Sequence, residues 1–292
     1  MKRLGALGTA ALVVVGLLVV VAVGAPWIAP HDPNLSDLLA AYQGPSPSHL
    51  LGTDGTGRDI ASRVIWGART SLLGPAAVIA LSLAVGVPLG LAAAWRGGAL
   101  DAVVARVLDV IFSLPGILLA VLTVAVFSPG LPPAVIALSI AYLPYVGRVV
   151  RSAARQQRVQ PYIAALEVQG SSGLAICLRH ILPNIAGLVL AQATLAFGYA
   201  LIDLASLSFL GLAVQPPQAD WGVLANDSSS VLQGYPGQVV YASVCIVVTV
   251  VALITLGDRL AADRPALVRR WRRRPAAAPA VVAPRPAVEE AA

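Results

Sequence analysis

Residues 71–95 read SLLGPAAVIALSLAVGVPLGLAAAW, a stretch of 25 residues without a charged side chain. About 20 apolar residues are enough for a helix to cross the hydrocarbon core of a bilayer. The composition of the whole chain agrees with this, because 58% of its 292 residues are apolar and only 12% are charged, compared with about 25% charged residues in soluble domains. The sequence therefore predicts an all-α, polytopic membrane protein and argues against a water-soluble enzyme.

Further apolar runs bring the expected number of membrane-spanning helices to six. The fourth run, residues 134–147, is the shortest, and it spans a bilayer only if it tilts or if Arg148 snorkels to the interface. Pro88, Pro115 and Pro144 lie inside runs and predict kinks, which membrane helices tolerate. The six predicted spans are residues 7–25, 71–95, 103–127, 134–147, 181–210 and 239–257.

The first run, residues 7–25, follows Lys2 and Arg3 and fits either a spanning anchor or a cleaved signal peptide. Its length favours the anchor, because the apolar core of a signal peptide usually has about 7 to 15 residues. The polar segment behind it, up to about residue 70, is rich in Pro, Gly, Ser and Asp and predicts an external loop. Residues 59–68 are its one amphipathic helical stretch.

The basic residues predict the orientation of the chain. Six spans place both termini on one side, which then holds 17 of the 20 Lys and Arg residues. The other side holds three arginines together with six aspartates, so the positive-inside rule places both termini in the cytosol. The basic cluster at residues 269–274 predicts contact with anionic lipid rather than nucleic acid, and the tail beyond Pro275 predicts disorder.

Few residues of the chain suggest a catalytic, nucleotide-binding or metal-binding site. The chain contains no G-x-x-x-x-G-K-[ST] motif, so it cannot bind ATP through a P-loop. His31, His49 and His180 have no metal-ligand spacing, and no serine or cysteine has a plausible base nearby. Asp203 is the one carboxylate deep inside a span, which suggests either a role in a transport pathway or a carboxylate held by water or a neighbouring helix near the outer end.

The expected cytosolic loop at residues 148–184 is too long for a tight connection. Arginines at positions 148, 151, 155 and 158 share one face of a helix that continues out of the fourth span. Among them, Arg151 and Arg155 predict either a salt bridge to a cytosolic partner or an anchor to lipid. Residues 162–166 and Gly170 then predict a short helix stopped by glycine, which either docks in a groove of a partner or connects two spans at the membrane surface.

Several ordered stretches carry a resemblance to a known family. They are His49-Leu50-Leu51-Gly52-Thr53-Asp54 with Gly57-Arg58-Asp59, Gly67-Ala68-Arg69-Thr70-Ser71-Leu72, Asp109 through Pro115-Gly116, Gly170 with Ile181-Leu182-Pro183-Asn184, and residues 205–212 with 214–217 and Trp221-Gly222. Together they resemble the type-I permease subunits of bacterial ATP-binding-cassette importers, most closely the second-permease branch of the peptide and nickel permease family. The resemblance extends to about Asp263.

The resemblance implies half of a translocation pathway in the bacterial plasma (inner) membrane. Such a permease pairs with a homologous permease, two cytosolic ATPase subunits or domains that bind the ATP, and an external substrate-binding protein. It needs no cofactor or metal and has no catalytic residue of its own. In the family, this loop is called the EAA loop and its helix the coupling helix. Closure of the ATPases would push on the coupling helix, and the attached membrane helices would move with it as rigid bodies. The residues expected to dock on the ATPase are Tyr162, Ala165, Leu166, Gly170 and Ile176.

The sequence departs from the family pattern at two places. In the loop, a glutamate normally precedes two alanines, whereas here Ala164-Ala165-Leu166 occupies those positions and Glu167 follows. Leu204 stands where the family usually has a glutamate, and Asp203 comes one residue earlier. One residue is about 100° of rotation on a helix, so Asp203 is expected to face another surface.

The expected organisation is a first helix at residues 1–28, an external loop at 29–70, a permease core at 71–258 and a basic tail at 259–292. Two other functions fit a membrane protein of this composition. A self-sufficient secondary transporter would use Asp203 and predicts an internal repeat, which the sequence does not show convincingly. A non-transporting anchor would leave the motif at residues 52–59 unexplained. Dipeptides, longer peptides, nickel chelates and haem-like solutes all remain open as substrates.

Overall fold

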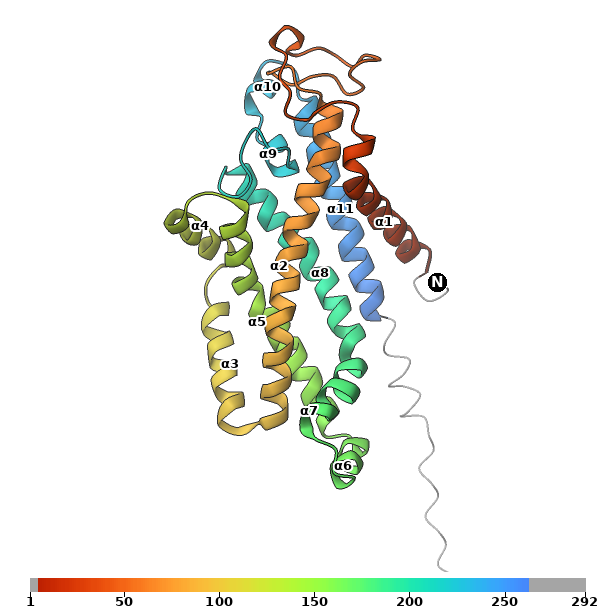
Figure 1. Ribbon diagram of the computed structural model, residues 1–292, viewed down its shortest axis with the longest axis vertical. Coiled ribbons are helices and arrows are strands. Elements are labelled where there is room, and N and C mark those ends of the chain that lie inside the picture. Colours follow the sequence, from red (N-terminus) through yellow and green to blue (C-terminus); the bar gives the residue numbers. More distant parts are fainter. Residues whose placement is uncertain (1–4, 263–292) are drawn as a thin grey trace, which may run out of the picture.

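The computed structural model describes residues 5–262, which are helical apart from loops and one isolated β-bridge between Thr53 and Asp59. The long helices are α1 (Gly5–Ile28), α2 (Ile60–Arg96), α5 (Leu131–Arg158), α8 (Leu182–Phe209) and α11 (Gly237–Ala262), and each is long and apolar enough to cross a membrane. The basic cluster 269–274 and the tail beyond residue 275 lie outside the described residues. The long helices run side by side in one elongated bundle (Figure 1).

The shorter elements lie mainly at the two ends of this bundle (Figure 1). We call the end that carries residues 29–59 the loop end and the opposite end the α6 end. The short elements are η1 (Leu38–Ala40), α6 (Pro161–Val168), α7 (Gly173–Ile176), the π-helix η2 (Cys177–Ile181), α9 (Trp221–Ala225) and α10 (Ser228–Leu232).

The second long helix begins earlier than predicted. The Asp59 carboxylate accepts a hydrogen bond from the Ser62 amide (2.8 Å) and caps α2 at Ile60. The amphipathic stretch 59–68 is therefore the start of α2, and the loop before it ends at residue 59. With 37 residues α2 is about 55 Å long, which exceeds the roughly 30 Å of a bilayer core, so it projects from the membrane.

The predicted span 103–127 is not one continuous helix. It consists of α3 (Gly98–Phe112) and α4 (Gly116–Phe127), which are bent by 79° at the break. Pro115 explains the break, because proline lacks an amide hydrogen and disfavours helical backbone in the residue before it. The expected kink is thus a sharp turn, and the pair makes a sixth span only if both helices cross the membrane as one unit.

The arginine-bearing segment continues α5 without interruption to Arg158, which confirms the predicted helix. The sequence did not predict the intrachain partners of these arginines, and all four contact α2 or α3 of the same chain. These contacts are Arg148 Nη2 to Asp109 Oδ1 (2.7 Å), Arg151 Nη2 to Asp101 Oδ2 (2.8 Å), Arg155 Nη1 to Asp101 Oδ2 (3.3 Å) and the Arg158 guanidinium over the Trp95 ring (5.0 Å). The arginines fasten α5 to its neighbours beyond the apolar part of the bundle.

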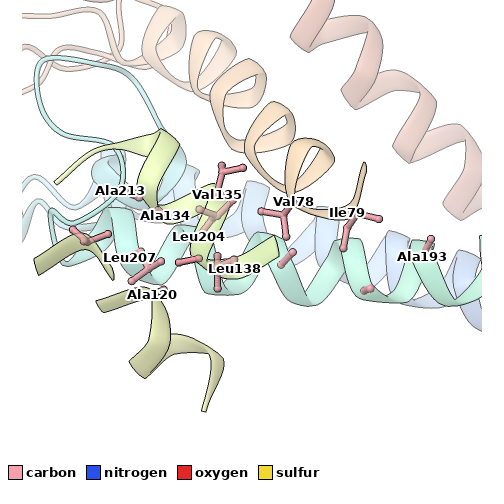
Figure 2. Close-up of a cluster of buried hydrophobic side chains, with 14 residues drawn as sticks. Val78, Ile79, Ala120, Ala134, Val135, Leu138, Ala193, Leu204, Leu207 and Ala213 are labelled. Carbon is pink, nitrogen blue, oxygen red and sulfur yellow. The ribbon is translucent and has the colours of Figure 1, made fainter. Parts of the chain in front are cut away.

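Small residues allow α2 and α5 to pack closely. Gly86 and Gly90 lie four residues apart on α2, and a Cβ atom on Gly90 would lie 2.9 Å from the Gly147 carbonyl oxygen on α5. This spacing is the small-xxx-small pattern of membrane helix pairs. Nearer the loop end, alanine, valine and leucine side chains from α2, α4, α5 and α8 form a continuous apolar core (Figure 2).

The first helix is an integral part of the bundle. Ala22 packs with Ala68 of α2 and Ala242 of α11, and Ala11 packs with Ala252. Small side chains on α1 thus face both neighbouring helices and allow close packing.

Candidate functional site

The helix α6 forms as the sequence predicted. Pro161 occupies its first turn, where a missing amide hydrogen costs nothing. Gly170 ends it with a φ of +78°, and the amides of Gly170 and Ser171 donate to the carbonyl oxygens of Glu167 (3.0 Å) and Leu166 (3.1 Å). This is a Schellman motif, which fixes the end of the helix and the direction of the chain behind it.

Two long helices hold α6 in place. Ile163 is only 1% exposed and packs in the apolar cluster that contains Val150 of α5 and Ile185 of α8. The Tyr162 hydroxyl donates to Gln157 Oε1 of α5 (2.9 Å) and accepts from Asn184 Nδ2 of α8 (3.1 Å). A force on α6 therefore reaches α5 and α8 together.

The outer face of α6 is apolar and open. Tyr162, Ala165 and Gly170 are exposed and Leu166 is half-buried, so four of the five residues predicted to dock have surface available. Ile176 does not, because it is fully buried in the cluster beneath α6, and the expectation that it is exposed was wrong. An apolar side chain at the junction of two helices packs inward when a core is available there.

Sequence reasoning missed two exposed apolar residues at the α6 end, Val168 of α6 and Leu174 of α7. Val168 is 90% exposed and Leu174 is 72% exposed. Val168 follows Ala165 by three residues and lies on the same side of the helix, which is a signal that the sequence contains. The sequence does not indicate the exposure of Leu174, because that exposure depends on how α7 packs on the bundle.

The connection from α6 to α8 contains an irregular turn. Residues Gly173–Phe209 form one helical run, but the segment Cys177–Ile181 within it is a π-helix. Such segments are rare and are frequently found at functional sites. The π-helix lies between α6 and the membrane part of α8. A hinge at this position would let α6 and α8 change their relative orientation.

Asp203 is held by a neighbouring helix. The Tyr142 hydroxyl of α5 donates to Asp203 Oδ2 (2.8 Å), and both residues line a cavity of about 320 Å³ together with Tyr145 and Tyr199. Leu204 instead points into the apolar core (Figure 2). The shift of one residue from the family's glutamate position thus turns the carboxylate away from the core, as the helix geometry predicted.

At the loop end, the residues of the motif 52–59 stabilise the fold of the loop. The Asp54 carboxylate accepts hydrogen bonds from the Thr56 amide (2.8 Å) and from Arg58 Nε (2.8 Å), and it lies 3.6 Å from Nε of the buried Arg63. A Cβ atom on Gly57 would lie 1.6 Å from the Asp37 carbonyl oxygen. Burial opposes the charge on Asp54, but the hydrogen bonds from Arg58 and Thr56 outweigh this penalty and hold its pKa below the ordinary value.

We expect Asp54→Asn to lower stability at neutral pH. A carboxylate whose pKa is lowered by folding contributes stability that is present above the unfolded value of about 3.8 and is lost as the pH falls through the folded value. The difference in Tm between wild type and variant should therefore shrink below about pH 4. Thermal unfolding in detergent at several pH values measures it, and a pH-independent difference would contradict the assignment.

Three motif stretches meet near the start of α9. The Ser71 hydroxyl of α2 donates to Asp220 Oδ2 (2.6 Å) and accepts from the Trp221 amide (3.0 Å). A Cβ atom on Gly222 would lie 2.3 Å from the Ala205 carbonyl oxygen of α8. The motif residues around Ser71, Ala205 and Trp221 thus form one junction of α2, α8 and α9.

Two descriptions of protein families match the chain. A family described as "Binding-protein-dependent transport system inner membrane component" matches residues 86–272. The chain belongs to this family. A second model, "N-terminal TM domain of oligopeptide transport permease C", matches residues 6–45. The chain is a multi-pass inner-membrane protein and a permease subunit of an ATP-binding-cassette importer, which decides against the secondary transporter.

Named relatives of this permease cover most of its length. It is 36% identical over 254 residues to a dipeptide transport system permease protein, DppC, of Alkalihalophilus pseudofirmus, covering 85% of this chain and 84% of the relative. It is 40% identical over 253 residues to a glutathione transport system permease protein, GsiD, of Escherichia coli, covering 86% and 83%.

A solved structure shares the fold of this permease. The MetNI methionine ABC transporter, in an inward-facing conformation, has a chain that superposes with a TM-score of 0.54 at 20% identity, covering 68% of this chain and 95% of that one. The type-I importer fold that the sequence predicted is thereby confirmed.

Proposed function

We propose that this permease forms half of the pathway of an ATP-driven importer of peptides or peptide-like solutes, and that α6 is the coupling helix that transmits ATPase closure. The observation that carries this is the position of α6, which is fastened to α5 and α8 and carries an exposed apolar face. An apolar face at the tip of a projecting bundle fits the groove of a partner protein.

The proposed partners follow from the family and from the residues of this chain. They are a homologous permease, two cytosolic ATPase subunits or domains, and an external substrate-binding protein. Catalysis and ATP binding then belong to the partners, and this chain supplies the pathway and the coupling. The arginines of α5 gather near the α6 end, which supports placing that end and both termini in the cytosol.

The geometry suggests how motion passes through this chain. When the ATPases close, α6 moves with them, and its contacts to Gln157 and Asn184 carry the displacement into α5 and α8. The ion pairs from Asp101 to Arg151 and Arg155 make α3 follow α5. The π-helix, which joins α7 to α8, lets α8 turn relative to α6 and α7, and the helices then open or close the pathway as nearly rigid bodies.

We further propose that Asp203 lines the pathway. Asp203 lines a cavity between α4, α5 and α8 together with Tyr142, Tyr145 and Tyr199, and the Tyr142 hydroxyl donates to its carboxylate. A carboxylate among hydroxyl groups suits the ammonium group of a peptide, which is the substrate class that the names of the dipeptide and glutathione relatives suggest.

Asp203→Asn is expected to raise the peptide concentration for half-maximal uptake by about tenfold, because it removes the charge while its amide oxygen still accepts from Tyr142. Copurification of the ATPase should stay unchanged. Uptake of an N-acetylated peptide, which has no ammonium group, is the control and should change little. An equal loss for both peptides would contradict a role in binding the amino terminus.

The proposed function itself is tested by uptake in a strain that lacks this gene. Labelled dipeptides, longer peptides and glutathione are supplied in turn, with and without the gene on a plasmid. We expect uptake of at least one peptide to require the gene and intracellular ATP and to persist after the proton gradient is collapsed. Uptake that follows the proton gradient instead of ATP would overturn the proposal.

A further inference from the structure

Two histidines that are 18 residues apart in the sequence meet at the loop end, beside the carboxylate that caps α2. The ring centroids of His31 and His49 are 5.0 Å apart. His49 Nδ1 lies 3.1 Å from Asp59 Oδ1, and His31 Nδ1 lies 3.8 Å from Asp59 Oδ2. The sequence spacing suggested no metal-ligand arrangement, but folding of the loop brings these three groups together.

The backbone holds this cluster firmly. The amide of His31 donates to Ser62 Oγ of α2 (3.0 Å), and the amide of His49 donates to the carbonyl oxygen of Ser46 (3.1 Å). Asp59 is fixed by the Ser62 amide and hydroxyl, both of which bind Oδ2. These bonds leave Asp59 Oδ1 with His49 as its only hydrogen-bonding partner among the described residues.

The cluster is open to solvent on one side. The side chain of Asp59 is 2% exposed, that of His49 is 19% exposed and that of His31 is 41% exposed. Exposure thus increases from the carboxylate outwards, so a small ion can enter past His31 and reach a buried carboxylate. Two imidazoles and one carboxylate with an open position are a ligand set that Zn²⁺ binds in proteins.

We propose that His31, His49 and Asp59 bind one Zn²⁺ ion at the loop end, with water in the fourth position. The candidate ligand atoms all lie within 4.8 Å of one another. Bonds of about 2.0–2.2 Å in tetrahedral geometry need ligand atoms about 3.3 Å apart. The cluster therefore has to contract modestly, and the exposed His31 ring is the part that is free to move. A bound ion would join the segment after α1, the loop and α2 at one point.

The test is equilibrium dialysis of the purified full-length chain, carrying a tag without histidine, against buffered Zn²⁺, followed by measurement of the metal content. We expect one Zn²⁺ per chain. His31→Ala and His49→Ala should each weaken binding at least about tenfold, since loss of a group that only orients a ligand already costs 10- to 100-fold. His180→Ala, on the π-helix at the α6 end, is the matched control and should bind like wild type.

A second set of measurements identifies the ligands and tests whether the ion stabilises the fold. X-ray absorption of the zinc-loaded wild-type chain should show nitrogen and oxygen ligands with the scattering pattern of two imidazoles. Zn²⁺ should also raise the Tm of wild type and of His180→Ala but not that of His49→Ala, because a ligand that binds only the folded state stabilises it. Sulfur ligands, which would point to the cysteines, or wild-type protein that takes up no Zn²⁺ would overturn the proposal.

Discussion

Gly170→Asp is expected to abolish copurification of the ATPase and to reduce uptake more than tenfold, while the chain still inserts into the membrane. Gly170 has a φ of +78°, which costs an L-residue about 1–2 kcal/mol. The new carboxylate would stand at the C-terminus of α6 near Glu167, where both the helix dipole and the like charge oppose it. The end of α6 would therefore unwind or be repelled from its partner. Copurification from membranes and uptake of labelled peptide measure the two effects.

Gly234→Asp is the matched control. Gly234 has a φ of +87° and ends α10 with the same motif, since its amide donates to Val231 and the Tyr235 amide donates to Ser230. A Cβ atom meets nothing within 4 Å at either Gly170 or Gly234. Both variants bear similar backbone strain, but only Gly170 lies at the α6 end. Equal retention of ATPase by the two variants would show that α6 is not the docking element.

Gly90→Leu is expected to lower the Tm by roughly 2–12 °C and to reduce the yield of intact complex. A Cβ atom there would lie 2.9 Å from the Gly147 carbonyl oxygen and 2.9 Å from Val150 Cβ, so α2 and α5 must separate. Overpacking of this kind costs about 1–3 kcal/mol or more, and each kcal/mol shifts the Tm by about 2–4 °C in a chain of this size class. Thermal unfolding in detergent measures the loss.

Gly16→Leu controls for the added apolar surface. Gly16 lies in α1 with nothing within 4 Å of the position of a Cβ atom, and the substitution also removes a helix-weakening glycine. Its Tm should stay at or above that of wild type. If Gly90→Leu and Gly16→Leu unfold at the same temperature, close packing of α2 on α5 does not hold the bundle together.

The features that the sequence predicted well are those with local causes. Uncharged apolar runs predict membrane helices whatever their neighbours, and the three- and four-residue spacing of the arginines on α5 is the spacing of residues that share one helix face. Gly170 and Pro161 mark the ends of α6 through their own backbone preferences. The rotation between Asp203 and Leu204 follows from helix geometry alone.

The features that the sequence could not show depend on contacts between distant segments. Pro115 marks the place of the turn between α3 and α4, but the 79° bend brings both helices against α5, a contact between distant segments. Ile176 is buried because α6 folds back over it, and Arg151 finds Asp101 50 residues away. His31 and His49 meet only because the loop after α1 returns to the start of α2. No periodicity in the chain encodes these pairings.

The most direct test of the central claim is to tag this chain in its native host, solubilise it gently, and identify the copurifying proteins by mass spectrometry. An importer permease that couples through α6 should bring a second, homologous permease and one or two P-loop ATPases, and the ATPase should be lost selectively from Gly170→Asp. Recovery of the chain alone, or only as a homodimer, under conditions that keep other importers of the same membrane intact would contradict the account.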